Sequence, residues 1–271
     1  MTLFLSPPSF DGFDGGAGSR YQARREIRSF WYPTWLAMPA ALIPNSKLMD
    51  CPPHDINVED CLKEAKKYDH VIIHTSTPSL PNDCKVAEAI KEQSHSTQIG
   101  FVGAHTMVLP EETLTSSWAI DWVARGEFDY TCKEISEGRP FSEVKGIVYK
   151  AKDGKIVSNP ERELIQNLDE LPWVTDVYKR DLDITKYSIG YLKEPYISLY
   201  TGRGCPSRCT FCLWPQTIAG HTYRVRSADN VVAEMSHAQK LFPEVEEYFF
   251  DDDTFTANLP RAREIAVKLK K

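Results

Sequence analysis

Three closely spaced cysteines are the residues of this chain best suited to chemistry. Cys205, Cys209 and Cys212 lie in the stretch GRGCPSRCTFC, separated by three and then by two residues. A short loop can wrap so that all three sulfurs point toward one metal centre. The chain has seven cysteines, so this loop holds nearly half of them. The spacing predicts a metal or cluster site.

Four interpretations of these cysteines are open. A structural zinc site usually has four ligands, so Cys132 or a histidine would have to complete it. A disulfide is disfavoured in a reducing compartment, and the regular spacing beside Gly202 and Gly204 argues against unrelated buried thiols. A four-iron cluster normally takes four cysteines, so three would leave one iron free for an external ligand. The pattern therefore favours a [4Fe-4S] cluster with one open iron.

The segment CPSRCTFC resembles the CxxxCxxC signature of the radical SAM superfamily. The resemblance implies that S-adenosylmethionine binds the open iron and is cleaved reductively to a 5′-deoxyadenosyl radical. It also implies that Phe211 lies against the adenine. Because the cleavage consumes an electron, a donor such as a flavodoxin or ferredoxin is an expected partner.

Charged residues near the motif have two interpretations each. In the acidic turn FFDDDTF, Asp251, Asp252 and Asp253 are candidates to contact the methionine amino group, although the family's Gly-Gly-Glu sequence is absent. The alternative is a solvated turn before a helix capped near Asn258. Arg203 and Arg208 flank the cysteines, and they would either balance the charge of the cluster or lie on the surface.

The elements that must position these residues follow from the apolar pattern. Over residues 1–140, short apolar runs alternate with amphipathic helical stretches, which predicts an α/β domain with a doubly wound parallel sheet. Ligands on such sheets bind at the carboxyl ends of the strands. The predicted strands are Leu3–Leu5, Ser46–Asp50, His70–Thr77, Gln98–Ala104 and Ala119–Gly126, and the predicted helices are Val58–Tyr68 and Cys84–Gln93.

The pattern changes after this domain. Residues 141–193 are predicted to form a hairpin, with its turn at Asp153-Gly154, and a polar linker. Residues 194–271 are predicted to hold two βα units, including strand Pro195–Thr201 and helix Ser227–Phe242, whose N-cap is Ser227 or Asp229. A radical SAM partial TIM barrel usually needs six such units, so we expect a truncated barrel and a fragment that is inactive alone.

Composition limits the classes of partner. The chain has 271 residues, is 42% hydrophobic and has a net charge of −6, which gives no reason to expect nucleic acid. No apolar run is long enough to span a bilayer, and the start of the chain is unlike a signal peptide. A cytoplasmic location is expected.

A βα array ahead of the cysteine motif is similar to the cobalamin-binding subgroup of radical SAM proteins, as are the segments FVGAHTMVLPEETL and IDWVARGEFD. The resemblance implies that cobalamin lies on the strand ends. The D-x-H-x-x-G motif that supplies a cobalt ligand in some cobalamin proteins is absent. His54, His74 and His105 lie at predicted strand ends, and His105 is the candidate for cofactor contact. The alternative for each is a hydrogen-bonded loop histidine.

Four segments resemble radical SAM proteins associated with hopanoid biosynthesis: PPSFDGFDGGAGSRYQARREIRSFWYPTWLA, YTGRGC, CTFCLWPQT and FFDDDTFT. This resemblance implies that the sugar of a hopanoid is rearranged to a cyclitol ether, with peripheral contact at the inner membrane surface. The alternatives are a cobalamin-dependent methyltransferase on a lipid or natural product, and a non-catalytic metal-binding module.

The first of those segments combines arginines with aromatic residues. Such a set can grip a polyol or phosphate while stacking on rings, or it can form a packing or membrane-adjacent surface. Its members are Arg20, Tyr21, Arg24, Arg25, Arg28, Phe30, Trp31, Tyr32 and Trp35.

Overall fold

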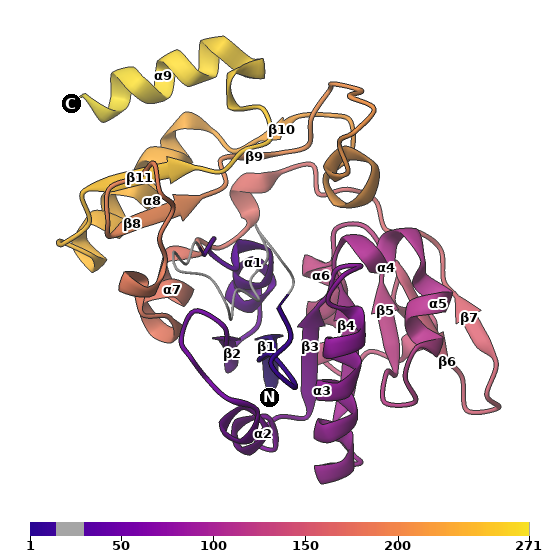
Figure 1. The fold of residues 1–271 in the computed structure, drawn as a ribbon. Coiled ribbons are helices and arrows are strands. Elements are labelled where there is room, and N and C mark those ends of the chain that lie inside the picture. Colours follow the sequence, from indigo (N-terminus) through magenta and orange to yellow (C-terminus); the bar gives the residue numbers. More distant parts are fainter. Residues whose placement is uncertain (15–29, 271) are drawn as a thin grey trace.

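The larger of two main sheets has a parallel portion in the order β2-β1-β3-β4-β5, extended by an antiparallel hairpin (Figure 1). The structure is a computed structural model, and it describes residues 1–14 and 30–270. The parallel strands are β1 (Thr2–Ser6), β2 (Ser46–Asp50), β3 (His70–His74), β4 (Gln98–Val102) and β5 (Trp122–Ala124). The hairpin is β6 (Ile147–Lys150) and β7 (Ile156–Ser158), and β6 pairs with β5.

Apolar side chains on both faces explain why these runs form a central sheet. In β1, Phe4 faces one core, while Leu3 and Leu5 face the other. One face is covered by helices α2 (Val58–Ala65), α3 (Leu80–Gln93) and α5 (Pro110–Thr115). The opposite face is covered by α1 (Thr34–Leu42), α6 (Asp129–Ser136) and α7 (Thr175–Asp181). The predicted doubly wound α/β architecture is confirmed.

The second sheet contains a βα unit in which β8 (Tyr196–Leu199) pairs in parallel with β11 (Glu247–Phe250). Helix α8 (Ala228–Leu241) connects them, and α9 (Leu259–Leu269) follows. A short antiparallel ladder of β9 (Gly202–Arg203) and β10 (Arg224–Val225) lies between β8 and α8 in sequence. This ladder closes the base of the cysteine loop.

Helix boundaries follow from local side chains. Ser227 is the N-cap of α8, since its side chain accepts a hydrogen bond from the Asn230 amide. Asn258 caps α9 in the same way through the Arg261 amide. Helix α3 begins at Leu80, four residues before the predicted start. Pro81 does not prevent this, because a proline is tolerated in the first turn of a helix.

Helices α1, α6 and α7 were not predicted from the sequence. The region predicted as a polar linker contains α7, and it buries Tyr178 and Tyr187 completely. Helix α6 begins two residues after Glu127, in a segment predicted as a loop at a strand end. Both helices are short, at seven and eight residues, so neither shows a long apolar period.

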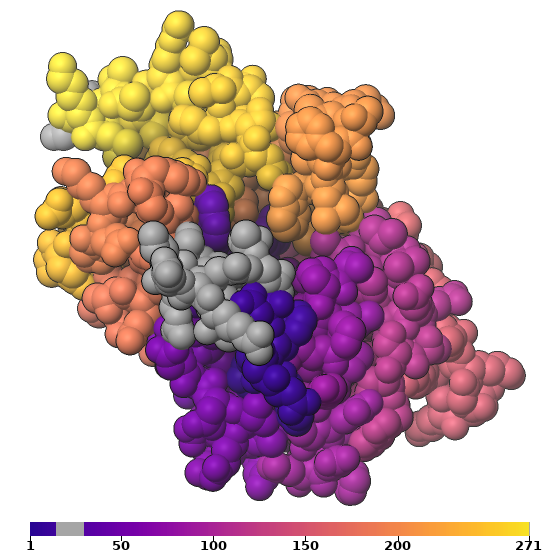
Figure 2. All heavy atoms as spheres, in the orientation of Figure 1, coloured from indigo at the N-terminus to yellow at the C-terminus, as the bar shows by residue number. Residues whose placement is uncertain are grey.

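One hydrophobic core joins the two sheets. It contains Phe4 and Ile72 from the large sheet together with Ile197 and Leu199 from β8. In Figure 2 the segment that follows the linker (orange to yellow) packs along one side of the N-terminal part (indigo to magenta). Within the described residues, no helix is both long and apolar enough to cross a bilayer.

Candidate functional site

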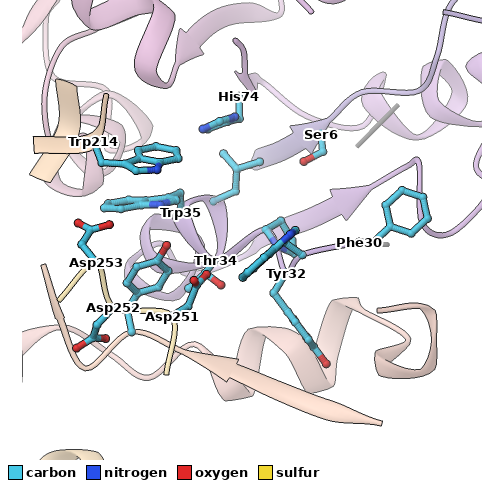
Figure 3. A pocket seen from close by; sticks show the side chains of 14 residues that line it. Ser6, Phe30, Tyr32, Thr34, Trp35, His74, Trp214, Asp251, Asp252 and Asp253 are labelled. Atoms are coloured by element: carbon cyan, nitrogen blue, oxygen red, sulfur yellow. The ribbon is translucent and has the colours of Figure 1, made fainter. Parts of the chain in front are cut away.

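A cavity of about 400 Å³ lies where the carboxyl ends of β1 and β3 meet the second sheet. Its size is typical of small-molecule sites. Figure 3 shows Ser6 and His74 on the side of the large sheet and the three aspartates on the opposite side. The cavity is lined by Ser6, Phe30, Trp31, Tyr32, Pro33, Thr34, Trp35, Leu36, His74, Tyr200, Trp214, Asp251, Asp252 and Asp253.

The acidic turn that follows β11 forms one wall of this cavity. Burial raises the pKa of Asp251 to about 7, and the charges of Asp252 and Asp253 contribute to the increase. Partial burial also raises the pKa of Asp253, the most exposed of the three. Because Asp251 is close to half protonated near neutral pH, it can donate or accept a proton there.

Asp252 has a different role from its neighbours. Its carboxylate accepts hydrogen bonds from the Thr201 amide, the Thr201 hydroxyl and the Tyr223 hydroxyl, each at 2.6 Å. Burial raises its pKa, although these hydrogen bonds act in the opposite direction. Asp252 therefore ties the turn to the end of β8. Asp251 interacts with the Tyr200 side chain, and Asp253 is the most exposed of the three that line the cavity. The turn is thus more than the solvated turn considered above, although Asn258 does cap α9.

The aromatic residues predicted as a gripping surface are brought to the cavity. Phe30, Trp31, Tyr32 and Trp35 all line it, and in Figure 3 the Trp35 ring lies next to that of Trp214. Tyr32 is anchored, because its hydroxyl donates to the Tyr196 carbonyl at 2.6 Å. The other members of the set, Arg20, Tyr21, Arg24, Arg25 and Arg28, lie outside the described residues.

The cysteine loop leaves β9 beside the cavity. Cys209 is exposed, and Cys205 and Cys212 are half-buried. Phe211 is 90% exposed and does not line the cavity, whereas Trp214, two residues after the last cysteine, does. Cys132 is fully buried in the core shared by the sheets. Over residues 1–14 and 30–270, all seven cysteines are free thiols and no set of three or more Cys, His, Asp or Glu is arranged around a metal position.

The three strand-end histidines differ in their surroundings. His54 is a hydrogen-bonded loop residue, with Nδ1 2.8 Å from the Asp50 carbonyl oxygen and Nε2 accepting from the Asp183 amide. His105 lies in α4 (Ala104–Val108), with Nδ1 2.9 Å from the Thr77 hydroxyl. It does not line the cavity, and His74 does. Cofactor contact by His105 stays a prediction.

Two arginines that bracket the cysteine loop are buried in ion pairs. Arg203 donates to both carboxylate oxygens of Asp129, at 2.8 and 2.9 Å, and Arg224 donates to both oxygens of Glu127. Burial by itself would lower the pKa of Arg203, but Asp129 and Glu127 outweigh that effect and raise it. The surface interpretation of Arg203 is wrong, since its side chain is buried. That Arg203 balances the charge of a cluster stays a prediction. Glu127 and Asp129 were not singled out from the sequence.

The donor set suits the cofactors that the resemblance implies. Three thiols on one loop, without a disulfide, are the ligand chemistry of an iron–sulfur cluster. At the large sheet, Ser6 lines the cavity with a buried Oγ that has no hydrogen-bond partner among the described residues. The buried Nε2 of His105 likewise has no partner in that part of the chain. Such buried polar atoms are suited to meet the polar groups of a large cofactor.

Curated proteins similar in sequence include methyltransferases. The chain is 34% identical over 259 residues to an uncharacterized methyltransferase of Pyrococcus horikoshii, covering 91% of this chain and 54% of that protein. It is 27% identical over 209 residues to the cytidylyl-2-hydroxyethylphosphonate methyltransferase of Streptomyces wedmorensis (67% and 38%). It is 28% identical over 195 residues to the hopanoid C-3 methylase of Methylococcus capsulatus (67% and 35%). The chain thus spans about half the length of the first of these relatives and less of the others. No protein-family model matches the chain.

Solved structures share the fold. The cobalamin-dependent S-adenosylmethionine radical enzyme OxsB, with aqua-cobalamin and S-adenosylmethionine bound, matches with a TM-score of 0.73 at 16% identity, over 100% of this chain and 37% of that one. The radical S-adenosylmethionine methyltransferase TsrM from Kitasatospora setae, with cobalamin and a [4Fe-4S] cluster bound, matches with a TM-score of 0.65 at 15% identity (98% and 50%). The chain therefore has the fold of cobalamin-binding radical SAM enzymes, as predicted.

Proposed function

We propose that this chain is the cofactor-binding part of a cobalamin-dependent radical SAM methyltransferase. The observation that carries the proposal is that the acidic turn, the strand ends of the large sheet and Trp214, two residues after the last cysteine, line one cavity. The fold match over the whole chain and the methyltransferases among the relatives support it. They favour methyl transfer over the sugar rearrangement that the sequence first suggested.

In this proposal each residue has a limited task. Cys205, Cys209 and Cys212 would hold the cluster, and Ser6 and His74 would face cobalamin at the strand ends. When bound, the cluster, S-adenosylmethionine and cobalamin supply the electron, the methyl group and its carrier. Asp251 and Asp253 would accept hydrogen bonds from a cationic amine, because carboxylates in a partly buried wall favour a positive partner. The electron would come from a donor such as a flavodoxin or ferredoxin.

The aromatic wall would control access of water. Trp35, Tyr200 and Trp214 contribute aromatic rings to the lining of the cavity. Excluding water strengthens the interactions of the aspartates and protects a reactive intermediate from quenching. Asp251 would also hold or release a proton at its carboxyl oxygen during turnover, since its pKa is about 7.

A hopanoid is the proposed substrate class. The hopanoid C-3 methylase among the relatives supports a hopanoid acceptor as well as methyl transfer. The rearrangement of a hopanoid sugar to a cyclitol ether stays the competing proposal. The two differ in product mass, because methylation adds one methyl group and rearrangement of the sugar does not.

The experiment uses the full-length protein, reconstituted without oxygen with iron, sulfide and cobalamin. It is given methyl-labelled S-adenosylmethionine, a low-potential reductant and a bacterial hopanoid extract. We expect a cluster absorption band and a labelled product heavier by one methyl group. Cys205→Ala is expected to abolish both, while Cys84→Ala, at a buried free cysteine remote in sequence from the loop, leaves the cluster in place.

Two outcomes would contradict the proposal. A colourless protein that contains zinc would identify the three cysteines as a zinc site. A protein that holds the cluster but gives an unlabelled hopanoid product of altered structure would support the rearrangement instead.

A further inference from the structure

Four buried charged residues connect the large sheet to the base of the cysteine loop. Arg203 and Arg224 are directly opposite each other in the β9–β10 ladder, so they occupy the two chain segments from which the loop emerges. Their partners Asp129 and Glu127 lie at the start of α6 and two residues before it, in the segment that follows β5 of the large sheet. All four side chains are at most 5% exposed.

The set is balanced and well hydrogen-bonded. It contains two cations and two anions, and Arg203 also lies 3.4 Å from a Glu127 oxygen, so the two pairs form one network. Arg224 additionally donates to the carbonyl oxygens of Ile165 and Ala219. A buried ion pair offsets its desolvation cost only when its geometry is good and its charges are partnered. Here both carboxylates accept two hydrogen bonds from an arginine, while the buried Nε of Arg224 has no partner among the described residues.

The network reaches both the loop and the cavity. Arg203 is separated from Cys205 only by Gly204, and the Cys205 amide donates to the Gly220 carbonyl across the loop base. On its other side, the Arg203 guanidinium lies 5.3 Å from the ring centroid of Trp35, which lines the cavity. A shift of Asp129 would therefore move the first cysteine and a cavity wall together.

We infer that Asp129 and Glu127 are positioning residues that hold the cysteine loop at a fixed position relative to the large sheet. This inference rests on the proposed function for its catalytic consequence, but the contacts themselves do not depend on it. Through Arg203 and Arg224, the sheet that would carry one cofactor fixes where the other is bound. A neutral partner at residue 129 would leave the buried Arg203 charge without its main counter-charge, which favours opening of the loop base.

The test compares Asp129→Asn and Glu127→Gln with Arg162→Gln. Arg162 forms a part-buried ion pair with Glu134 in the same region, but it is not part of the loop base.

The first readout needs no cofactor. It is the rate at which iodoacetamide alkylates each cysteine of the apo full-length protein, mapped by mass spectrometry. We expect about tenfold faster alkylation of half-buried Cys205 in the Asp129 and Glu127 variants, because local opening sets the accessibility of partly buried groups. Exposed Cys209 is expected to change little in any variant.

The second readout is the electron paramagnetic resonance spectrum of the reduced, reconstituted cluster with S-adenosylmethionine. We expect an altered or heterogeneous signal in the Asp129 and Glu127 variants and an unchanged one in Arg162→Gln. Asp129→Glu, which keeps the charge, is expected to recover part of the native spectrum. Circular dichroism confirms that each variant is folded.

The failures of the two proposals are distinguishable. If the unaltered protein takes up no iron, the proposed function is wrong, and the alkylation rates still decide the positioning role. If native-like alkylation rates and spectra persist in folded Asp129→Asn and Glu127→Gln, the positioning role is wrong whatever the enzyme does.

Discussion

At the scale of single residues, the cavity wall contains a carboxyl group out of its usual ionisation range. Asp251 is largely buried beside Asp252 and Asp253, and burial raises its pKa to about 7 from an ordinary 3.8. Ionising this carboxyl group costs more free energy in the folded state than in the unfolded chain. Perturbed carboxyl groups in cavities are typical of functional sites.

This shift predicts a pH dependence of stability. Because the folded pKa is higher than the unfolded one, the folded state binds more protons between about pH 4 and pH 7. The stability that protonated Asp251 contributes is therefore fully present below about pH 4, and it has been lost once the pH has risen through 7. The free energy of unfolding of Asp251→Asn minus that of the native protein is expected to be about 2 to 3 kcal/mol larger at pH 8 than at pH 5. Urea denaturation at both pH values measures it.

The control for this prediction is Asp229→Asn, at an exposed carboxylate in the first turn of α8. The difference between this variant and the native protein is expected to be nearly the same at both pH values. Parallel stability curves for Asp251→Asn and the native protein would show that Asp251 stays ionised in the folded state.

At the scale of elements, the sequence predicts the parallel strands well. Strand β2 has the predicted bounds, and β1, β3, β4 and β5 fall on or within the predicted apolar runs or extend them by one residue. Strands buried on both faces read as continuous apolar stretches bounded by turn residues, so their positions are visible locally. Helices α1 and α6 lack such a signal, and α1 includes Pro39 within its length.

The candidate site is only partly visible in the sequence for a different reason. The cysteines and the acidic turn are recognisable because their spacing is local. The partners of Arg203 lie 74 residues away, at Asp129, and nothing in the local pattern links them. Long-range ion pairs need the fold before they can be assigned, which is why Arg203 was interpreted only in relation to its neighbours in sequence.

The close packing around Gly204 at the loop base predicts that one added methyl group destabilises the protein. Gly204 has a positive φ of 92°, and an added Cβ would lie 2.3 Å from the Thr222 backbone oxygen. Gly204→Ala is therefore expected to cost roughly 3 kcal/mol or more, from the left-handed conformation plus the clash. Gly154→Ala is the matched control, since Gly154 has φ of 83° in open space and is expected to cost only about 1 kcal/mol. Equal losses in urea denaturation would mean that the loop base relaxes freely.

At the scale of the whole molecule, the two sheets share their interior. Tyr32 stacks on Tyr187 with centroids 4.3 Å apart and meets Tyr196 edge to face at 5.3 Å. Tyr187 in turn donates to Asp50 at the end of β2. These rings bring the start of α1, the segment before β8 and the edge of the large sheet into one aromatic cluster. The cavity lies beside it, so its walls depend on both sheets.

A shared core predicts that the described parts unfold together. Calorimetry of the chain is expected to show one transition whose calorimetric and van't Hoff enthalpies agree, because the core on one face of the large sheet is shared with the second sheet. Tyr32→Ala is expected to lower stability by about 3 to 5 kcal/mol and to keep the transition single. Tyr191→Ala, at a ring that is 67% exposed, is expected to stay within about 0.5 kcal/mol of the native protein. Two separate transitions in the native chain would show that the sheets unfold independently. The ion pairs of Arg203 and Arg224 would then be the contacts that couple the cysteine loop to the large sheet.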